Sequence, residues 1–260
     1  MRATRHLVRV TAMAATMAAA LAVAQTAQAS PVQIGIRSGL PTIGTVPALC
    51  SAAWPIPLAA CAASNSVVIT DGSSVAGAVD GNAAAGAITW AGSIGGWTLS
   101  VAGTGSNVLG SGIMDLDVSV STAGATTDTL EIYFSQLGNP WTSGNPVFQL
   151  DFDGTIGNGT ATSLAAVCPN NMDNFMMSRL IGTLGPFSSG SFDVSMQGST
   201  TPAISKTPYA LTQRILVTAT GAVTFDGDAQ VHPVPEPAST LLLGSGLIGL
   251  VARLRSTKRT

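Results

Sequence analysis

The sequence predicts an all-β protein, an antiparallel β-sandwich with a Greek-key or jelly-roll-like topology. From Val67 onward, short runs of residues alternate between apolar and polar side chains with a period of two. Clusters of Gly, Asn and Pro separate these runs, as expected of turns between strands. Charged residues make up 9% of the chain, against roughly 25% in an average soluble domain, and this argues against long amphipathic helices.

Five runs carry the alternation most clearly. In WTLSV, the side chains of Trp97, Leu99 and Val101 fall on one face, and the other runs are MDLDVSVS, LEIYFS, SFDVSMQ and RILVTATG. Strands with one buried and one solvated face are typical of antiparallel sheets, and two such sheets bury their apolar faces against each other. We therefore expect a β-sandwich ectodomain over residues 64–230. A β-solenoid is the alternative, and it is disfavoured because no fixed-period repeat is present.

The N-terminal segment has the three parts of a secretory signal peptide. Arg2, Arg5 and Arg9 precede the apolar run TAMAATMAAALAVA, and small residues follow it. Ala27 and Ala29 form an A-x-A cleavage site before Ser30. We expect residues 1–29 to be removed as the protein is exported.

Residues 30–63 are rich in proline and are expected to be irregular, with a disulfide loop. Cys50 and Cys61 bracket the run CSAAWPIPLAAC, and exported proteins can retain disulfides. In the chain-entropy model, closing this loop of 11 residues stabilises the fold by roughly 2.8 kcal/mol. Cys168 would then be a buried thiol or an intermolecular link.

The net charge of the exported body restricts its partners. Between Ser30 and Pro237 the chain has four basic and 13 acidic residues, a net charge of −9. A body of this sign repels phosphate and offers no basic groove, so the sequence argues against nucleic acid as a partner. Divalent cations or cationic polymers fit this charge better.

The C-terminal segment, residues 231–260, contains an extended motif, an apolar stretch and a basic end. Val234, Pro235, Glu236 and Pro237 form the motif, in which each proline disfavours a helical conformation of the residue before it. Residues 238–252 are uncharged and, as a helix, reach about 22 Å, which is short of a ~30 Å hydrocarbon core. We expect a short membrane helix over 238–252, because the tail 253–260 carries four positive charges that hold it in the cytoplasm. These charges are Arg253, Arg255, Lys258 and Arg259.

This ending, VPEP followed by LLLGSGLIGL and an Arg-rich end, resembles the PEP-CTERM sorting signal of Gram-negative bacteria. The same tail is also known as the ice-binding protein C-terminal domain, a name that implies no ice binding by the body. The resemblance implies an inner-membrane precursor that a membrane-embedded exosortase cuts near Pro235–Pro237. It further implies delivery to the cell surface or extracellular matrix, in connection with extracellular polysaccharide and biofilm. Residues 64–230 are similar to a β-rich ectodomain common in PEP-CTERM proteins, to which no chemistry is assigned.

The sequence offers little for catalysis, and we expect no catalytic residues. His232 is the one histidine that remains after export, and it lies beside the tail, a poor position for a preorganised base. No G-x-S-x-G, P-loop or H-E-x-x-H motif is present. Paired carboxylates for glycoside cleavage remain an alternative, because they require only two acids. The candidates are Asp115, Asp117, Glu131, Asp151 and Asp153.

Two weaker candidates for binding sites remain. Three D-x-D pairs are present, Asp115/Asp117, Asp151/Asp153 and Asp226/Asp228, and on a strand both carboxylates of a pair project from one face. We expect no cofactor; calcium held by Asp151 and Asp153 in DFDGTIGNG is the alternative. Trp141, in the loop GNPWTSGNP, is the candidate for stacking on a sugar ring.

Together these features predict an exported, non-catalytic surface or extracellular-matrix protein. The alternative is a secreted carbohydrate-binding module or polysaccharide hydrolase.

Overall fold

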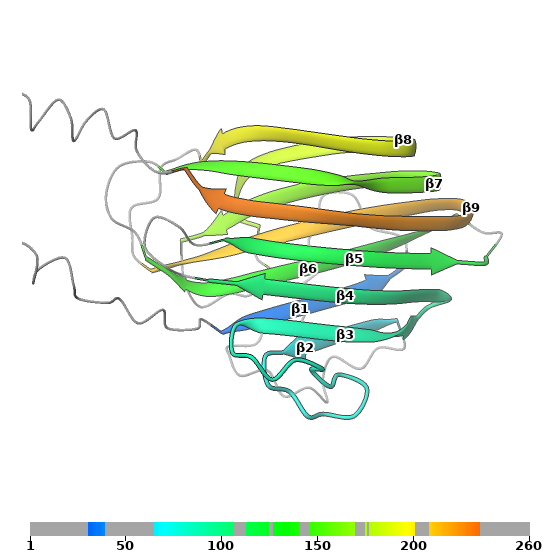
Figure 1. The fold of residues 1–260 in the computed structure, drawn as a ribbon, viewed down its shortest axis with the longest axis horizontal. Coiled ribbons are helices and arrows are strands. Elements are labelled where there is room, and N and C mark those ends of the chain that lie inside the picture. The colour runs from blue at the N-terminus through cyan, green and yellow to red at the C-terminus, as the bar shows by residue number, and fades with distance from the viewer. Residues whose placement is uncertain are drawn as a thin grey trace, which may run out of the picture.

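The structure is a computed structural model that describes residues 31–39, 65–106, 113–124, 127–140, 146–169, 175, 177–200 and 208–234. Within these ranges every regular element is a β-strand, which confirms the all-β prediction (Figure 1). The strands are β1 (Val32–Ser38), β2 (Ser66–Thr70), β3 (Ala87–Ile94), β4 (Trp97–Gly105), β5 (Met114–Thr122), β6 (Thr127–Asn139), β7 (Val147–Cys168), β8 (Arg179–Ser199) and β9 (Tyr209–Pro233).

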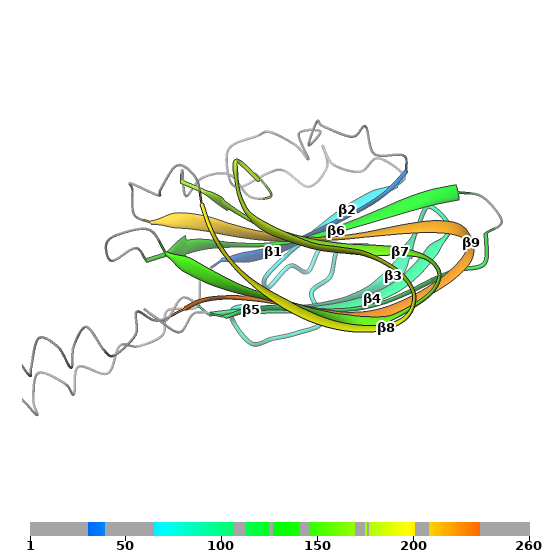
Figure 2. The same cartoon turned by 90° about the horizontal axis from the view of Figure 1, so that it is seen from above.

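Hydrogen bonds join these strands into one antiparallel sheet. The order is β2-β1-β6-β9-β5-β4-β3, with β7 beside β9 and β8 beside β7. The N-terminal half of β9 pairs with β6 and its C-terminal half pairs with β5. β7 pairs with β9 along both of these halves, and β8 pairs with β7. The three long strands therefore belong to both parts of the sheet, which folds over on itself where they bend (Figure 2). The expected sandwich is thus formed by two layers of a single sheet.

We call the two halves layer one and layer two. Their inner faces pack against each other and form the main hydrophobic core, in which Trp97, Leu99 and Val101 are buried as the alternation predicted. Layer one consists of β2, β1, β6 and residues 209–220 of β9, 160–168 of β7 and 179–188 of β8. Layer two consists of β3, β4, β5 and residues 223–233 of β9, 147–156 of β7 and 190–199 of β8.

The bend between the layers lies at positions that adopt left-handed backbone conformations. Gly221 in β9 has φ +130°, Gly190 in β8 has φ +98° and Asn158 in β7 has φ 57°. The run GTIGNGT is one of the Gly and Asn clusters that the sequence predicts as turns between strands. It lies instead within β7, where the register against β9 shifts between Gly157 and Gly159. Glycine tolerates such conformations, so the strand bends here without ending.

The expectation that residues 30–63 are irregular is wrong at β1. This strand lies between β2 and β6, and Val32, Ile34 and Ile36 are fully buried in the core. Its opposite face is also covered, because Gly35 lies against the ring of Phe175. A central strand that is buried on both faces does not show a solvated face in its sequence. The sheet also continues past residue 230, to Pro233.

Several predicted features lie outside the described residues. These are the signal peptide with Ala27, Ala29 and Ser30, the Cys50–Cys61 disulfide, Trp141, and the tail from Pro235 onward. Across the residues that the structure does describe, no helix has the length and apolar character needed to span a membrane.

Candidate functional site

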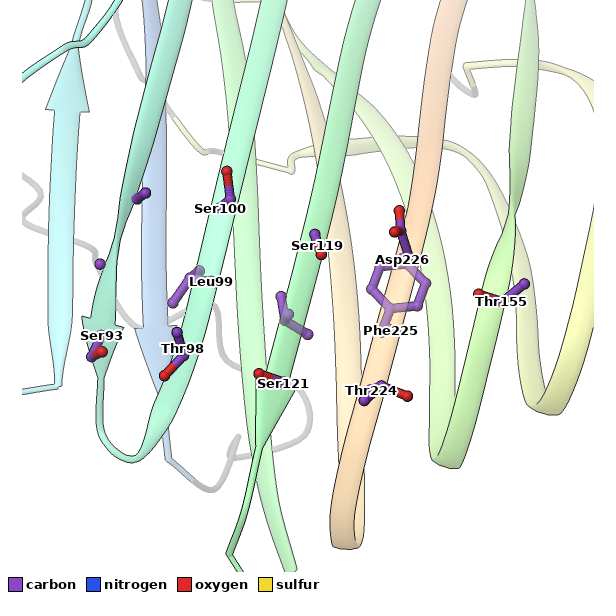
Figure 3. A pocket seen from close by; sticks show the side chains of 13 residues that line it. Ser93, Thr98, Leu99, Ser100, Ser119, Ser121, Thr155, Thr224, Phe225 and Asp226 are labelled. Carbon is purple, nitrogen blue, oxygen red and sulfur yellow. The ribbon is translucent and has the colours of Figure 1, made fainter.

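The outer face of layer two has a shallow groove of ≈ 770 Å³ that crosses five strands (Figure 3). Its floor consists of two rows of side chains that strand pairing places in register. The first row is Ser93, Thr98, Ser121 and Thr224, and the second is Ala91, Ser100, Ser119, Asp226 and Thr155.

The alternation that builds the core also builds this groove. On each strand the apolar residues turn inward, as Leu99, Val120 and Phe225 do, and the small hydroxyl residues between them face solvent. The structure gives the hydroxyl groups of Ser100 and Ser119 no hydrogen-bond partner among the described residues. A serine or threonine hydroxyl can both donate and accept, so this surface suits a ligand rich in hydroxyl groups.

A second hollow of ≈ 460 Å³ continues the groove over the free edge of β3. It shares Ala91 and Ser100 with the groove and is also lined by Trp90. The indole ring of Trp90 is half-buried, and its N–H donates to the carbonyl of Gly77 at 3.2 Å. The ring lies over Gly92, where an added Cβ would be 2.4 Å from it. Trp90 is in phase with the core residues Ile88 and Ile94 on β3, and its ring packs against the hydrophobic core, on the opposite face of the strand from the two hydroxyl rows. Only the exposed part of the ring lines the hollow at the edge of β3.

The segment 71–86, which forms the wall of this hollow, is organised by Asp80. The Asp80 carboxylate accepts hydrogen bonds from the backbone N–H groups of Gly72 at 2.9 Å, Asn82 at 2.9 Å and Thr89 at 3.0 Å. Thr89 belongs to β3, so this one side chain ties the segment to the edge of the sheet. Hydrogen bonds to a charged acceptor are stronger than those between neutral groups, and they fix the wall in place.

Beside the groove, aspartates form a row across four neighbouring strands. In register, Asp117 of β5 faces Asp228 of β9, which faces Asp153 of β7, which in turn faces Asp193 of β8. Asp115 and Asp151 lie one row farther from the groove, opposite Gln230. Strand order thus gathers all three predicted D-x-D pairs on one face. The set of seven is Asp115, Asp117, Asp151, Asp153, Asp193, Asp226 and Asp228, which we call the acidic face.

Burial and mutual repulsion shift the proton affinity of this acidic face. Burial, followed by a hydrogen bond and the charge of Asp115, raises the pKa of Asp228 to about 6. The pKa values of Asp117 and Asp153 are also raised, first by burial and then by the charge of Asp228. Oδ1 of Asp115 and Oδ1 of Asp228 are buried without a donor among the described residues. When both side chains are ionised, neither has a proton to donate to the other. Ionising the whole row therefore costs free energy.

Asp151 and Asp153, the predicted calcium ligands, differ in their surroundings. Asp151 accepts a hydrogen bond from the Gln149 amide at 3.0 Å, and its Oδ2 atom lies 3.6 Å from Nε2 of His232. Asp153 is exposed. In the part of the chain that the structure describes, no three His, Cys, Asp or Glu side chains are grouped so as to hold a metal ion. Calcium at these residues stays a prediction.

Glu131, another of the candidate acids, is a buried structural group on the outer face of layer one. Its carboxylate pairs with Arg37 at 2.5 Å and Arg214 at 3.6 Å, and it accepts a hydrogen bond from the Tyr133 hydroxyl at 3.0 Å. Burial, followed by the charge of Glu131, raises the pKa of Tyr133. The two layers therefore differ: layer one holds Glu131 in a buried network with two arginines, and layer two exposes a groove and carboxylates.

The other residues noted from the sequence have structural positions. The Trp97 indole is buried in the core, and its N–H donates to Asp128 at 2.7 Å. Cys168 is buried beside Leu137 in a small apolar cluster. Trp90 is one of the four tryptophans that the sequence offers for stacking on a sugar ring, and the structure packs its ring against the core at the edge strand β3, beside the second hollow.

Comparison with known proteins gives one specific match and several weak likenesses. No curated protein matches the chain. Among solved structures, similar folds include the family 11 carbohydrate-binding module of Clostridium thermocellum in complex with a β-1,3-1,4-mixed-linked tetrasaccharide. This likeness has 16% identity and a TM-score of 0.30, and it covers 60% of this chain and 94% of that one. The N-terminal cellulose-binding domain of Cellulomonas fimi β-1,4-glucanase C has 12% identity and a TM-score of 0.30, covering 46% and 80%. With TM-scores this low, these likenesses support no inference about this chain.

The specific match lies where β9 ends. The family described as "PEP-CTERM protein-sorting motif" matches residues 233–256, which include Val234, Pro235, Glu236 and Pro237. The match begins at Pro233, the last residue of β9, so the motif directly follows the folded sheet. The chain carries a PEP-CTERM protein-sorting motif, which indicates an exported protein made as a membrane-anchored precursor that is processed.

Proposed function

We propose that this is an exported, non-catalytic protein of the cell surface or extracellular matrix, sorted and cut by an exosortase in connection with exopolysaccharide and biofilm. The observation that carries this proposal is the PEP-CTERM motif at residues 233–256. The motif starts where the sheet ends, and the N–H of Val234 still donates to the carbonyl of Val147 at 2.8 Å. The folded body thus reaches to the edge of the sorting signal, and this supports cleavage just after it, near Pro235–Pro237.

Electrostatics supports release by cleavage. On this proposal residues 238–252 span the membrane, and the tail with Arg253, Arg255, Lys258 and Arg259 stays in the cytoplasm. Each Lys or Arg at the centre of a membrane helix costs about 2.5–3.5 kcal/mol, and four would have to cross together. The body cannot therefore leave the membrane by pulling its tail through. A cut near Pro235–Pro237 removes this barrier.

The groove supports binding better than catalysis. Asp226 is the one ionisable residue among the side chains that line it, and its neighbours in the row are Ser119 and Thr155. Glycoside hydrolysis usually needs two carboxyl groups on either side of the bond that breaks. The next carboxylates, Asp117 and Asp228, lie one row away on the same face of the sheet as Asp226 and not on opposite sides of a bound chain. This arrangement fits a ligand that is held without being cut.

The intact mass of the surface or secreted form tests the proposed processing. We expect the mature protein to end near Pro237 and to lack residues 241–260. Glu236→Ala should accumulate as the full-length form in the inner membrane. Lys258→Ala is the matched control, and it should be processed normally because three positive charges remain in the tail. A surface form whose mass still includes the basic tail would overturn the proposal.

A further inference from the structure

The groove and the hollow beside it form one continuous site that is long in the direction across the strands. Neighbouring strands lie about 4.8 Å apart, so the crossing from β3 to β7 spans roughly 19 Å. The second hollow extends this length over the edge of β3 to Trp90. A site that is long, shallow and open along its length suits a linear polymer better than a compact small molecule.

The lining matches the chemistry of sugar rings. Serine and threonine hydroxyls in two parallel rows can exchange hydrogen bonds with the hydroxyl groups of a glycan. The exposed part of Trp90 adds apolar surface to the hollow at the edge of β3, beyond the end of these rows, while its N–H is satisfied elsewhere. Apolar contact combined with a few placed polar groups is the usual composition of a ligand site.

The charge on this face selects among glycans. Asp226 lies within the groove, and Asp117, Asp228 and Asp153 form the next row along the same face, about 7 Å away. The arginines of the described chain, Arg37, Arg179 and Arg214, lie on segments of layer one. Uronic acids, sulfated sugars and phosphates would be repelled here. Ammonium groups would form charge-assisted hydrogen bonds with these carboxylates.

We propose that the groove on layer two binds a polysaccharide that carries free amino groups. The serine and threonine rows contact ring hydroxyls, the hollow at the edge of β3 takes a further sugar ring, and Asp226 with Asp117 and Asp228 holds the ammonium groups. This inference rests on the proposed function, since it names the polymer that an exported matrix protein of this charge would contact.

Calorimetry on the full-length protein, with two hexamers that share one backbone, tests the proposal. One probe is the β-1,4-linked hexamer of glucosamine, and the other is cellohexaose, which has a hydroxyl group in place of each amine. At low salt and pH 6 we expect the glucosamine hexamer to bind at least tenfold more tightly. Raising sodium chloride to about 0.5 M should remove most of this difference, because salt screens charges at an exposed site.

Three variants locate the site. Asp226→Asn should weaken binding of the glucosamine hexamer by about tenfold and binding of cellohexaose by less than about twofold, because an amide can still exchange hydrogen bonds with hydroxyl groups. Ser100→Ala should weaken both probes, because its hydroxyl lines both the groove and the hollow. The matched control is Asp193→Asn, which removes the same charge from the far end of the acidic row, on β8, and should change the affinity less than twofold.

Several results would overturn the proposal. Equal affinity for the two hexamers would refute selection by charge, and binding of neither would refute the site. Binding that persists unchanged in Asp226→Asn would place the ligand elsewhere. Equal binding of hexalysine would show attraction to charge without recognition of a glycan. None of these results alters the mass of the processed protein, so failure here is distinguishable from failure of the proposed function.

Discussion

Replacing Asp228 with Asn should stabilise this protein at neutral pH. Asp228 is central in the acidic row, between Asp117 and Asp153, and it contacts Asp115. Asn has nearly the same shape, and its amide oxygen can keep the hydrogen bond that the Gln230 amide donates to Asp228 at 2.9 Å. The substitution therefore removes a charge from a crowded row and leaves the packing in place.

The magnitude follows from the shift in the pKa of Asp228, which rises from 3.8 to about 6 in the folded protein. The folded state holds this proton more tightly than the unfolded state, so the free energy of unfolding falls as the pH rises from about 4 to above 6. A shift of this size corresponds to at most about 3 kcal/mol. Because the side chain is partly exposed, solvent screening reduces the expected effect to about 1 kcal/mol.

Urea unfolding at pH 4 and pH 8 measures this effect. We expect Asp228→Asn to raise the free energy of unfolding by about 1 kcal/mol at pH 8, to have little effect at pH 4, and to flatten the pH dependence between them. Asp193→Asn is the control, because it removes the same charge from an exposed position on β8. If Asp228→Asn is less stable than the wild type at pH 8, the Asp228 charge does not destabilise the fold. If Asp193→Asn gains as much stability, the effect comes from the net charge of the protein and not from the position of Asp228.

Three further predictions concern the wall, the fold of the sheet and the N-terminal segment. Asp80→Ala should lower the free energy of unfolding by about 1–3 kcal/mol in urea titration, because the Asp80 carboxylate accepts three backbone hydrogen bonds. An unchanged midpoint of urea unfolding would contradict this role. Gly154→Ala should lower the free energy of unfolding by at least about 1 kcal/mol in the same titration. Gly154 has φ +152°, and an added Cβ would lie 2.4 Å from the carbonyl oxygen of Asp226. A neutral result would mean that the backbone relaxes there. Non-reducing peptide mapping should find Cys50 joined to Cys61, and either cysteine found as a thiol argues against the disulfide.

The fold class was predictable from the sequence because layer two and much of layer one have one solvated face. Where a face is solvated, as in MDLDVSVS of β5, the period of two is visible in the sequence. Where both faces are covered, as in β1, Gln33 and Gly35 are buried beside the apolar residues and the pattern gives no solvated face. The fold-over of the sheet was not predictable, because glycine clusters mark a bend within a strand and a turn between strands in the same way.

The candidate site was visible only in pieces. Each D-x-D pair predicted two carboxylates on one face of its own strand, and the structure agrees for each pair. Their meeting depends on the order β5-β9-β7, in which β9 lies between two strands that precede it by many residues. No local pattern encodes this order, and the serine and threonine rows depend on the same pairing. The strand order therefore determines which residues meet at the site, whereas the residue types themselves, aspartate, serine and threonine, are visible in the sequence.

The position of the groove along β9 determines whether it is usable before the protein is released. Asp226 precedes Pro233 by seven residues of continuous strand, which at about 3.3 Å per residue places the groove about 23 Å from the start of the sorting motif. On the proposed function, a precursor held by its tail therefore presents the groove beyond the membrane surface. We expect full-length Glu236→Ala, purified in its membrane, to bind the glucosamine hexamer with the affinity of the processed form. A precursor that binds more than about tenfold more weakly would show that the membrane covers the groove and that cleavage switches binding on.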